Sequence, residues 1–336
     1  MSNTTDPQAF TGDRALRWCG RVERAGAGAR FGWPGCGFLA RFAGTSARAR
    51  ITTVNPDYFE LVIDGRSSLL ITQPGTHEYD LATDLDPAPH TLSLHRRTES
   101  FNGTIVVEKV SFGSGSLLPP PPLSNKRLEV IGDSISAGYG VECNDPAVGF
   151  SYATENHYKS YAAIAARELG AELMTMAWSG IGMYRSHDGW TEDQMPVIYP
   201  RTIAIDKGSA WDFSAFEPGA VIIHLGTNDF AQGDPGPRFV ATYLDFAASV
   251  RRHYPSARMY CALSPMLPRG SRVRLASYLA EVVSTRRGAG DGNVAVIEVA
   301  RPSAEEGWAC DYHPSAATHV TMARLLARTL EADLGW

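Results

Sequence analysis

The sequence has few of the residue patterns that mark metal and cofactor proteins. Its five cysteines are widely spaced over 336 residues and form no Cys-x-x-Cys pair, which disfavours a zinc site and a disulfide framework. It also has no Walker loop, no dinucleotide fingerprint and no His-Glu-x-x-His motif. Nucleotide, NAD and zinc-protease chemistry therefore lack their usual residues. We expect no cofactor and no metal.

Long apolar runs and a strong net charge are missing as well. No apolar run approaches the roughly 18 residues of a membrane span, and residues 1–14 are polar, without the apolar core of a signal peptide. The net charge of −5 gives no reason to expect nucleic acid or an anionic membrane as partner. These features predict a cytoplasmic globular protein. A secreted or periplasmic chain whose leader had been removed would have the same features, and the oligomeric state stays open.

The first third of the chain has the residue pattern of an all-β domain. Short runs with β-branched and aromatic residues are separated by turn signals such as Asp64-Gly65. These runs lie at residues 37–53, 58–63, 68–72, 77–81, 90–95 and 104–112. Their spacing predicts a β-sandwich or jelly roll. A proline-rich stretch at residues 117–123 follows, so we divide the chain into domains at 1–123 and 124–336.

The rest of the chain alternates between strand and helix patterns. Strands are predicted at residues 128–131, 173–177, 220–225, 259–263 and 294–299, and helices at 160–169, 238–253, 272–286 and 316–334. Such alternation indicates a parallel sheet with helices on both faces. We therefore expect a three-layer α/β/α domain after the sandwich.

A serine follows the first of these strands. In Gly132-Asp133-Ser134-Ile135-Ser136-Ala137-Gly138, the glycines permit a tight strand-to-helix turn. Ser134 would lie in the first turn of a helix, where unpaired N–H groups stabilise an oxyanion. Short Gly, Asp and Ser strings are also common in ordinary surface turns, so this interpretation depends on other motifs.

Two other motifs agree with a nucleophilic serine. Gly226-Thr227-Asn228-Asp229 directly follows the strand at 220–225, and ligands of open α/β sheets bind at that edge. Asp311-Tyr312-His313-Pro314 lies in a loop just before the last helix. His313 is the candidate base that a serine needs at neutral pH. The alternatives are that Asn228 and Asp229 form a turn or cap, and that His313 is a surface histidine.

Together with Trp178-Ser179-Gly180-Ile181-Gly182, these motifs resemble the SGNH hydrolase superfamily, also called GDSL esterases. They are most similar to carbohydrate esterase family 2. The resemblance implies a flavodoxin-like SGNH domain behind a jelly-roll domain. It also implies a serine esterase that removes acetyl groups from a carbohydrate such as xylan, mannan or xyloglucan through an acyl-enzyme. Ser134 would be the nucleophile and His313 the base, with the Ser134 N–H, the Gly180 N–H and the Asn228 amide as oxyanion donors.

The sequence departs from the superfamily pattern at the third triad position. Many SGNH enzymes have an aspartate three residues before the histidine, where this chain has Cys310, and Asp311 stands two before His313. In an extended loop the Asp311 carboxylate would reach the ring, but in a helical turn it would not. A backbone carbonyl replaces it in similar enzymes, which gives a Ser-His dyad. Both alternatives stay open, as does a bond between Cys143 and Cys310.

The predicted substrate contacts lie in the motif loops: Asp133, Tyr139, Trp178, Trp308 and Tyr312. Aromatic faces of this kind stack on sugar rings, although they also serve plain packing. Because a fold does not fix its substrate, the alternatives are a lipid esterase, an acyl-thioesterase and a non-catalytic carbohydrate-binding protein. The intact Ser134, Gly180, Asn228 and His313 favour an enzyme.

Overall fold

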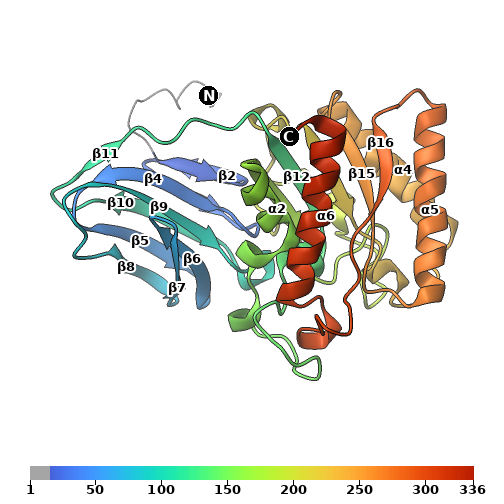
Figure 1. Cartoon of the computed structure of the whole chain (residues 1–336), viewed down its shortest axis with the longest axis horizontal. Coiled ribbons are helices and arrows are strands. Elements are labelled where there is room, and N and C mark those ends of the chain that lie inside the picture. Colours follow the sequence, from blue (N-terminus) through green and yellow to red (C-terminus); the bar gives the residue numbers. More distant parts are fainter. Residues whose placement is uncertain (1–15) are drawn as a thin grey trace.

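The computed structural model describes residues 16–336, so the polar stretch at 1–14 lies outside the described residues. Figure 1 shows two layers of antiparallel strands (blue to blue-green) beside a parallel sheet flanked by helices (green to red). The two parts lie against each other, with the chain passing from the first to the second through the segment after β11. Within residues 16–336, no helix has the length and apolar character needed to cross a membrane.

The N-terminal part is a sandwich of two antiparallel sheets. One sheet has the order β1-β4-β9-β6-β7, with β11 also paired to β4, and the other has the order β2-β3-β10-β5-β8. The strands are β1 Arg17–Cys19, β2 Val22–Ala25, β3 Gly28–Phe31, β4 Gly37–Ala43, β5 Ala47–Thr53, β6 Asp57–Ile63, β7 Arg66–Thr72, β8 Gly75–Ala82, β9 Pro89–Arg96, β10 Ile105–Ser111 and β11 Ser116–Leu118.

Alternation of side chains explains how these strands form a sandwich. In β5, the side chains of Ala47, Ala49 and Ile51 are buried, whereas those of Arg48 and Arg50 are exposed. Successive side chains of a strand point to opposite faces, so one face of β5 packs against the other sheet and one meets solvent. The exposed arginines pair with carboxylates of the neighbouring strands.

The C-terminal part is built on a five-stranded parallel sheet. Its order, β13-β12-β14-β15-β16, is 2-1-3-4-5 in chain order, which is the flavodoxin-like arrangement. The strands are β12 Arg127–Gly132, β13 Glu172–Ala177, β14 Ala220–His224, β15 Arg258–Leu263 and β16 Val294–Glu298. The helices are α1 Ser134–Ala137, α2 Tyr161–Leu169, α3 Met195–Ile198, α4 Pro237–His253, α5 Arg269–Gly288 and α6 Ala316–Leu334.

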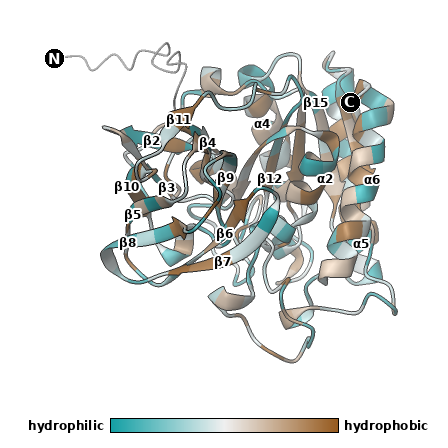
Figure 2. Ribbon diagram, turned by 60° about the vertical axis from the view of Figure 1, so that its left-hand side comes forward, coloured by the Kyte–Doolittle hydropathy of each residue, from teal (hydrophilic) through white to brown (hydrophobic). Residues whose placement is uncertain are grey.

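Two layers of helices cover this sheet because its strands are apolar on both faces. Leu128 and Val130 of β12 pack into a core shared with α2 and α6, whereas Ile131 joins the core that contains α4 and α5. In Figure 2 the parallel strands are largely brown, and α2 and α6 carry both brown and teal residues. This is the pattern of a sheet buried between amphipathic helices.

The predicted fold class is confirmed, with differences in the sandwich. The run expected at residues 37–53 forms two strands, β4 and β5, because Gly44 breaks it at a positive φ of 152°. β1, β2 and β3 were not predicted. They contain few β-branched residues. They are strands because β1 pairs with β4, β3 pairs with β10, and β2 pairs with β3. β11 extends into the stretch expected to be a linker.

A buried arginine joins the two parts. Arg21, between β1 and β2, has no exposed surface and donates to the carbonyl oxygens of Tyr199 and Arg201 in the C-terminal part. Its guanidinium lies 4.7 Å from the centre of the Tyr199 ring and 3.9 Å from the buried Glu129 carboxylate of β12. Tyr254 also donates to Glu129, at 2.8 Å. Arg21 of the sandwich and Glu129 of the parallel sheet thus compensate each other's charge across the junction.

We predict that Arg21→Met lowers the free energy of unfolding by about 3–5 kcal/mol, because it leaves the Glu129 charge buried without a cation. Urea denaturation followed by circular dichroism measures the loss. The matched control is Arg48→Met, which breaks an ion pair whose side chains are 61% and 51% exposed and should leave the free energy of unfolding nearly unchanged, because solvent screens such a pair. Adding Glu129→Gln to Arg21→Met should restore part of the stability. Equal losses from Arg21→Met and Arg48→Met would contradict this account.

Candidate active site

Ser134 is the first residue of α1 and follows β12 with one residue between them. The Asp133 carboxylate caps the helix by accepting from the N–H of Ile135 at 3.1 Å. A Cβ on Gly132 would stand 2.2 Å from the Ser136 hydroxyl oxygen, so this turn requires glycine before it. The tight turn leaves the Ser134 hydroxyl at the carboxyl edge of the sheet, 5% exposed.

His313 lies beside Ser134 in space, although the two are far apart in the chain. Its Nε2 lies 2.8 Å from the Ser134 hydroxyl oxygen, and the two residues are 179 positions apart in the chain. Burial lowers the pKa of His313 to about 4, although the carbonyl oxygens of Asp311 and Cys310 oppose that shift. The ring is therefore neutral at pH 7, with Nε2 free to accept the serine proton.

The other side of the ring faces the backbone. Nδ1 lies 3.2 Å from the Asp311 carbonyl oxygen and 3.3 Å from that of Cys310. The Asp311 carboxylate points elsewhere and accepts from the Tyr139 hydroxyl at 2.6 Å. Of the two orientations left open by the sequence, this geometry matches the backbone carbonyl. Asp311 and Tyr312 both have positive φ, 49° and 56°, which turns their carbonyls and side chains in this way.

Two contacts fix the histidine loop to the loop after α1. Cys143 and Cys310 form a disulfide, with their Cα atoms 5.5 Å apart. The Tyr139 ring stacks on the His313 ring at 4.1 Å between centroids. The sequence left this cysteine pair open and disfavoured a disulfide framework; of the other cysteines, Cys36 and Cys261 are buried and free.

Two backbone N–H groups at the site have no protein acceptor within residues 16–336: those of Ser134 and Gly180. Every other N–H from residue 178 to 185 donates within the protein. Gly180 has a φ of +81°, and a Cβ there would lie 2.9 Å from Nδ1 of His187. Free N–H groups beside a nucleophile suit a developing oxyanion.

Asn228 and Asp229 lie at the end of β14, in a short 3₁₀ turn. The Asn228 amide donates to the Ile181 carbonyl oxygen at 2.9 Å, and its side chain is mostly buried. Asp229 accepts from three consecutive N–H groups, those of Met183, Tyr184 and Arg185, at 2.7–3.0 Å. This pair therefore holds the loop that contains Gly180 against β14. Sequence analysis noted Asp229 only as a turn residue.

The predicted substrate contacts differ in accessibility. Tyr312 is 61% exposed, Trp308 and Trp178 are half-buried, and Tyr139 is covered by His313 and Phe150. Asp133 is fully buried, which differs from the substrate contact expected from the sequence. Its burial raises the pKa of its carboxyl to about 7.

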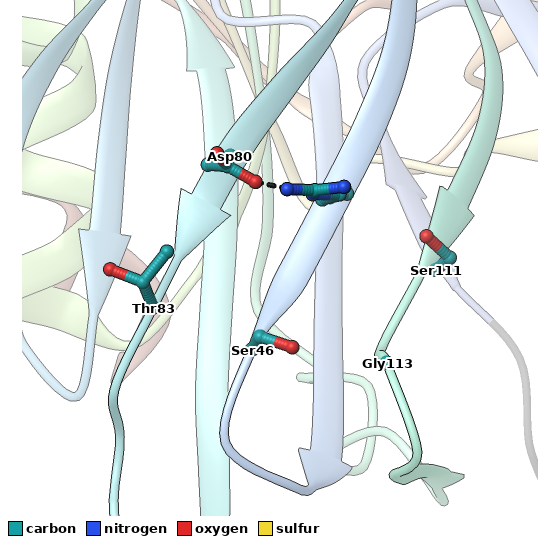
Figure 3. A pocket seen from close by; sticks show the side chains of 6 residues that line it. Ser46, Asp80, Thr83, Ser111 and Gly113 are labelled. Atoms are coloured by element: carbon teal, nitrogen blue, oxygen red, sulfur yellow. Dashed lines mark hydrogen bonds and ion pairs between the residues drawn. The ribbon is translucent and has the colours of Figure 1, made fainter.

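Other concave regions lie away from Ser134. A depression of about 340 Å³ on the sandwich is crossed by the Arg48–Asp80 ion pair (Figure 3). A larger groove, about 1880 Å³, follows the junction of the two parts. Among the described residues, no three His, Cys, Asp or Glu side chains come together as metal ligands would.

Comparison with family models and known proteins agrees with this geometry. The model "Carbohydrate esterase 2 N-terminal" matches residues 18–122, and "GDSL-like Lipase/Acylhydrolase family" matches residues 130–320. Cellulase/esterase CelE of Acetivibrio thermocellus is 35% identical over 92% of this chain, which spans 38% of that relative's length. An acetylxylan esterase / glucomannan deacetylase of Cellvibrio japonicus is 27% identical, over 91% of this chain and 85% of its own length.

Two solved structures are similar to this chain over 96% of its length. A family two carbohydrate esterase from Clostridium thermocellum, in complex with cellohexaose, has a TM-score of 0.92 at 35% identity, covering 96% of this chain and 100% of its own. A family 2 enzyme from Corynascus thermopiles (Myceliophthora fergusii) has a TM-score of 0.85 at 31% identity, covering 96% and 100%. The resemblance seen in the sequence is confirmed, and the chain belongs to carbohydrate esterase family 2.

Proposed function

We propose that this protein is a serine esterase that removes acetyl groups from a carbohydrate. The observation that carries the proposal is the 2.8 Å contact between the Ser134 hydroxyl and the neutral Nε2 of His313, beside two unpaired N–H groups. The names of the relatives, acetylxylan esterase and glucomannan deacetylase, support an acetylated polysaccharide as substrate.

In this mechanism Ser134 attacks the acetyl carbonyl while Nε2 of His313 accepts its proton. The negative charge that develops on the carbonyl oxygen is stabilised by the N–H groups of Ser134 and Gly180. The Asn228 amide joins them by giving up its long 3.5 Å contact with the Asp133 carboxylate, while it keeps its bond to Ile181. His313 then gives the proton to the sugar oxygen, which leaves, and water deacylates Ser134 by the same proton transfers in reverse. The scheme requires no metal ion.

The backbone holds the histidine in the reactive tautomer. A proton on Nδ1 is shared between the carbonyl oxygens of Asp311 and Cys310, which leaves Nε2 as the base. The disulfide at Cys310 holds the Cys310 carbonyl oxygen in place. We assign Asp311 the indirect role of holding Tyr139 against the ring, through its 2.6 Å bond to the phenol.

Among the aromatic residues of the loops, Tyr312 suits a sugar contact best. It is adjacent to His313 in the chain and is 61% exposed, so its ring face is accessible to a pyranose. Tyr139 instead packs between His313 and Phe150. We therefore place Tyr312, with Trp308 in the same loop, on the substrate side.

The disulfide also bears on the compartment. Disulfides persist mainly in oxidising environments, and the Cys143–Cys310 bond links the loop of the base to the loop after the nucleophile. This supports a secreted or periplasmic location, the second of the two that the sequence left open.

We predict that the purified protein releases acetate from at least one of acetylated xylan, mannan or xyloglucan, and that Ser134→Ala and His313→Ala each lower kcat by on the order of 10³-fold or more. The double variant should be little worse than either single one, because the two residues act as a unit. Acetate release and circular dichroism on the same samples measure activity and folding. A folded Ser134→Ala protein with a tenth of wild-type activity would exclude this mechanism.

Asp311→Asn tests the dyad. If the backbone orients His313, the substitution should cost about tenfold or less in kcat, through the lost charge near the imidazolium and a weaker bond to Tyr139. An orienting carboxylate would instead cost about 10⁴-fold. Hydrolysis of p-nitrophenyl acetate distinguishes the two, and a loss of 10³-fold or more in a folded variant would establish a triad.

The pH profile tests the state of His313. The base must be neutral, and its pKa is lowered to about 4 from an ordinary 6.5. Activity should therefore persist through pH 5–6 and be lost only as the pH falls through about 4. The profile of kcat/KM, which reports the free enzyme, measures this, with circular dichroism at each pH to separate it from acid unfolding. An acid limb near pH 6.5 in folded protein would show that the ring is not desolvated.

A further inference from the structure

Two carboxylic acids lie buried behind the candidate oxyanion hole, and the mechanism above does not use them. Glu99 belongs to the sandwich, between β9 and β10, and Glu155 belongs to the catalytic part, in the long loop after α1. Both have no exposed surface. Burying two carboxyl groups together is costly unless they are hydrogen-bonded, so their partners indicate what they do.

Glu99 reaches across the domain junction to Ser179. One carboxylate oxygen accepts from the Ser179 N–H at 2.6 Å, and the other accepts from the Ser179 hydroxyl. Ser179 directly precedes Gly180, and the peptide unit between them contains the Gly180 N–H. On the far side, the Gly180 carbonyl oxygen accepts from the N–H of His187 at 3.0 Å. The segment is thus held at both ends, and from residue 178 to 185 only the Gly180 N–H has no acceptor in the described part of the chain.

The charge state of the pair follows from the contacts. Burial raises the pKa of both carboxyls, and for Glu155 the neighbouring Glu99 raises it further, while Arg96 lowers both. Two carboxyl groups in contact do not both ionise at neutral pH. Glu99 receives two donors from Ser179, whereas neither Glu155 oxygen has a hydrogen-bond partner within residues 16–336. Glu155 is therefore the group that keeps its proton to higher pH, and Glu99 is the one that accepts from Ser179 as a carboxylate.

We propose that Glu99 is a positioning residue for ester hydrolysis: it fixes Ser179 so that the Gly180 N–H is directed at the oxyanion. The sandwich domain then supplies part of the support of the oxyanion hole. This inference rests on the proposed function, because an oxyanion forms only if Ser134 attacks an ester. A carboxylate that served the domain junction alone would affect unfolding and leave kcat unchanged.

The test is Glu99→Ala, with Glu99→Gln and Glu60→Gln beside it. Glu60 is a matched control at the same junction, where it is 6% exposed and accepts from the Asn156 amide at 3.2 Å without touching Ser179. Steady-state kinetics on p-nitrophenyl acetate separate kcat from KM, and thermal denaturation reports stability. Loss of an oxyanion donor costs about 10²–10³-fold in kcat, so a misdirected donor should cost roughly 10- to 100-fold with KM little changed.

Glu99→Gln should retain most of the activity, within about fivefold, since its amide oxygen accepts from the Ser179 N–H while its NH₂ group donates to the Ser179 hydroxyl. Glu60→Gln should keep kcat within about twofold even where it lowers the melting temperature. A kcat within threefold of wild type in folded Glu99→Ala would overturn the proposal.

If Glu99→Ala does not fold, Ser179→Ala carries the test, because it removes the hydroxyl's bond to Glu99 and leaves the carboxylate in place. Its kcat should fall below that of Glu99→Gln, and wild-type kcat in folded Ser179→Ala would overturn the proposal. The wild-type protein and Ser134→Ala are assayed in parallel. Activity that survives Ser134→Ala refutes the proposed function, whereas activity lost in Ser134→Ala but kept in Glu99→Ala refutes only the role of Glu99.

Discussion

The site depends on the parallel pairing of β12 with a neighbour on each side. In register, Gly132 at the end of β12 stands opposite Ala177 of β13 and His224 of β14. Because parallel strands end at the same edge, the segments that follow them meet there. Those segments carry Ser134, Gly180 and Asn228, so the pairing of the strands brings the proposed nucleophile and the proposed oxyanion donors to one edge of the sheet.

The proposed base, His313, is brought to this edge by different contacts. His313 follows β16, at the far side of the sheet, and no strand pairing places it beside Ser134. Its loop is held instead by the disulfide at Cys310, by the stacked Tyr139 ring, and by a hydrogen bond from the Asp311 N–H to the Val148 carbonyl oxygen at 3.1 Å. All three contacts come from the segment after α1. That segment therefore links the two ends of the catalytic part and fixes the direction of the imidazole.

The sandwich contributes buried charged side chains to both the parallel sheet and the site. Arg21 compensates the charge of Glu129 inside the parallel sheet, and Glu99 accepts from Ser179 beside the proposed oxyanion donors. Both side chains are fully buried, so separating the domains would expose or strand charges on each side. The same contacts that stabilise the junction also hold the loop of Gly180.

Periodicity and short motifs with a mechanism were enough to predict the strand-helix alternation, the sandwich before it, and the candidate nucleophile and base. The sequence did not reveal β1–β3, whose residues have weak strand preference and which join the sheets through β4 and β10. It also left the orientation of His313 open, since the positive φ of Asp311, which turns its carboxylate to Tyr139 and its carbonyl to the ring, is a property of the closed loop. The Cys143–Cys310 bond and the contact of Glu99 with Ser179 became visible only in the folded chain, because each joins residues at least 80 positions apart that no local pattern relates.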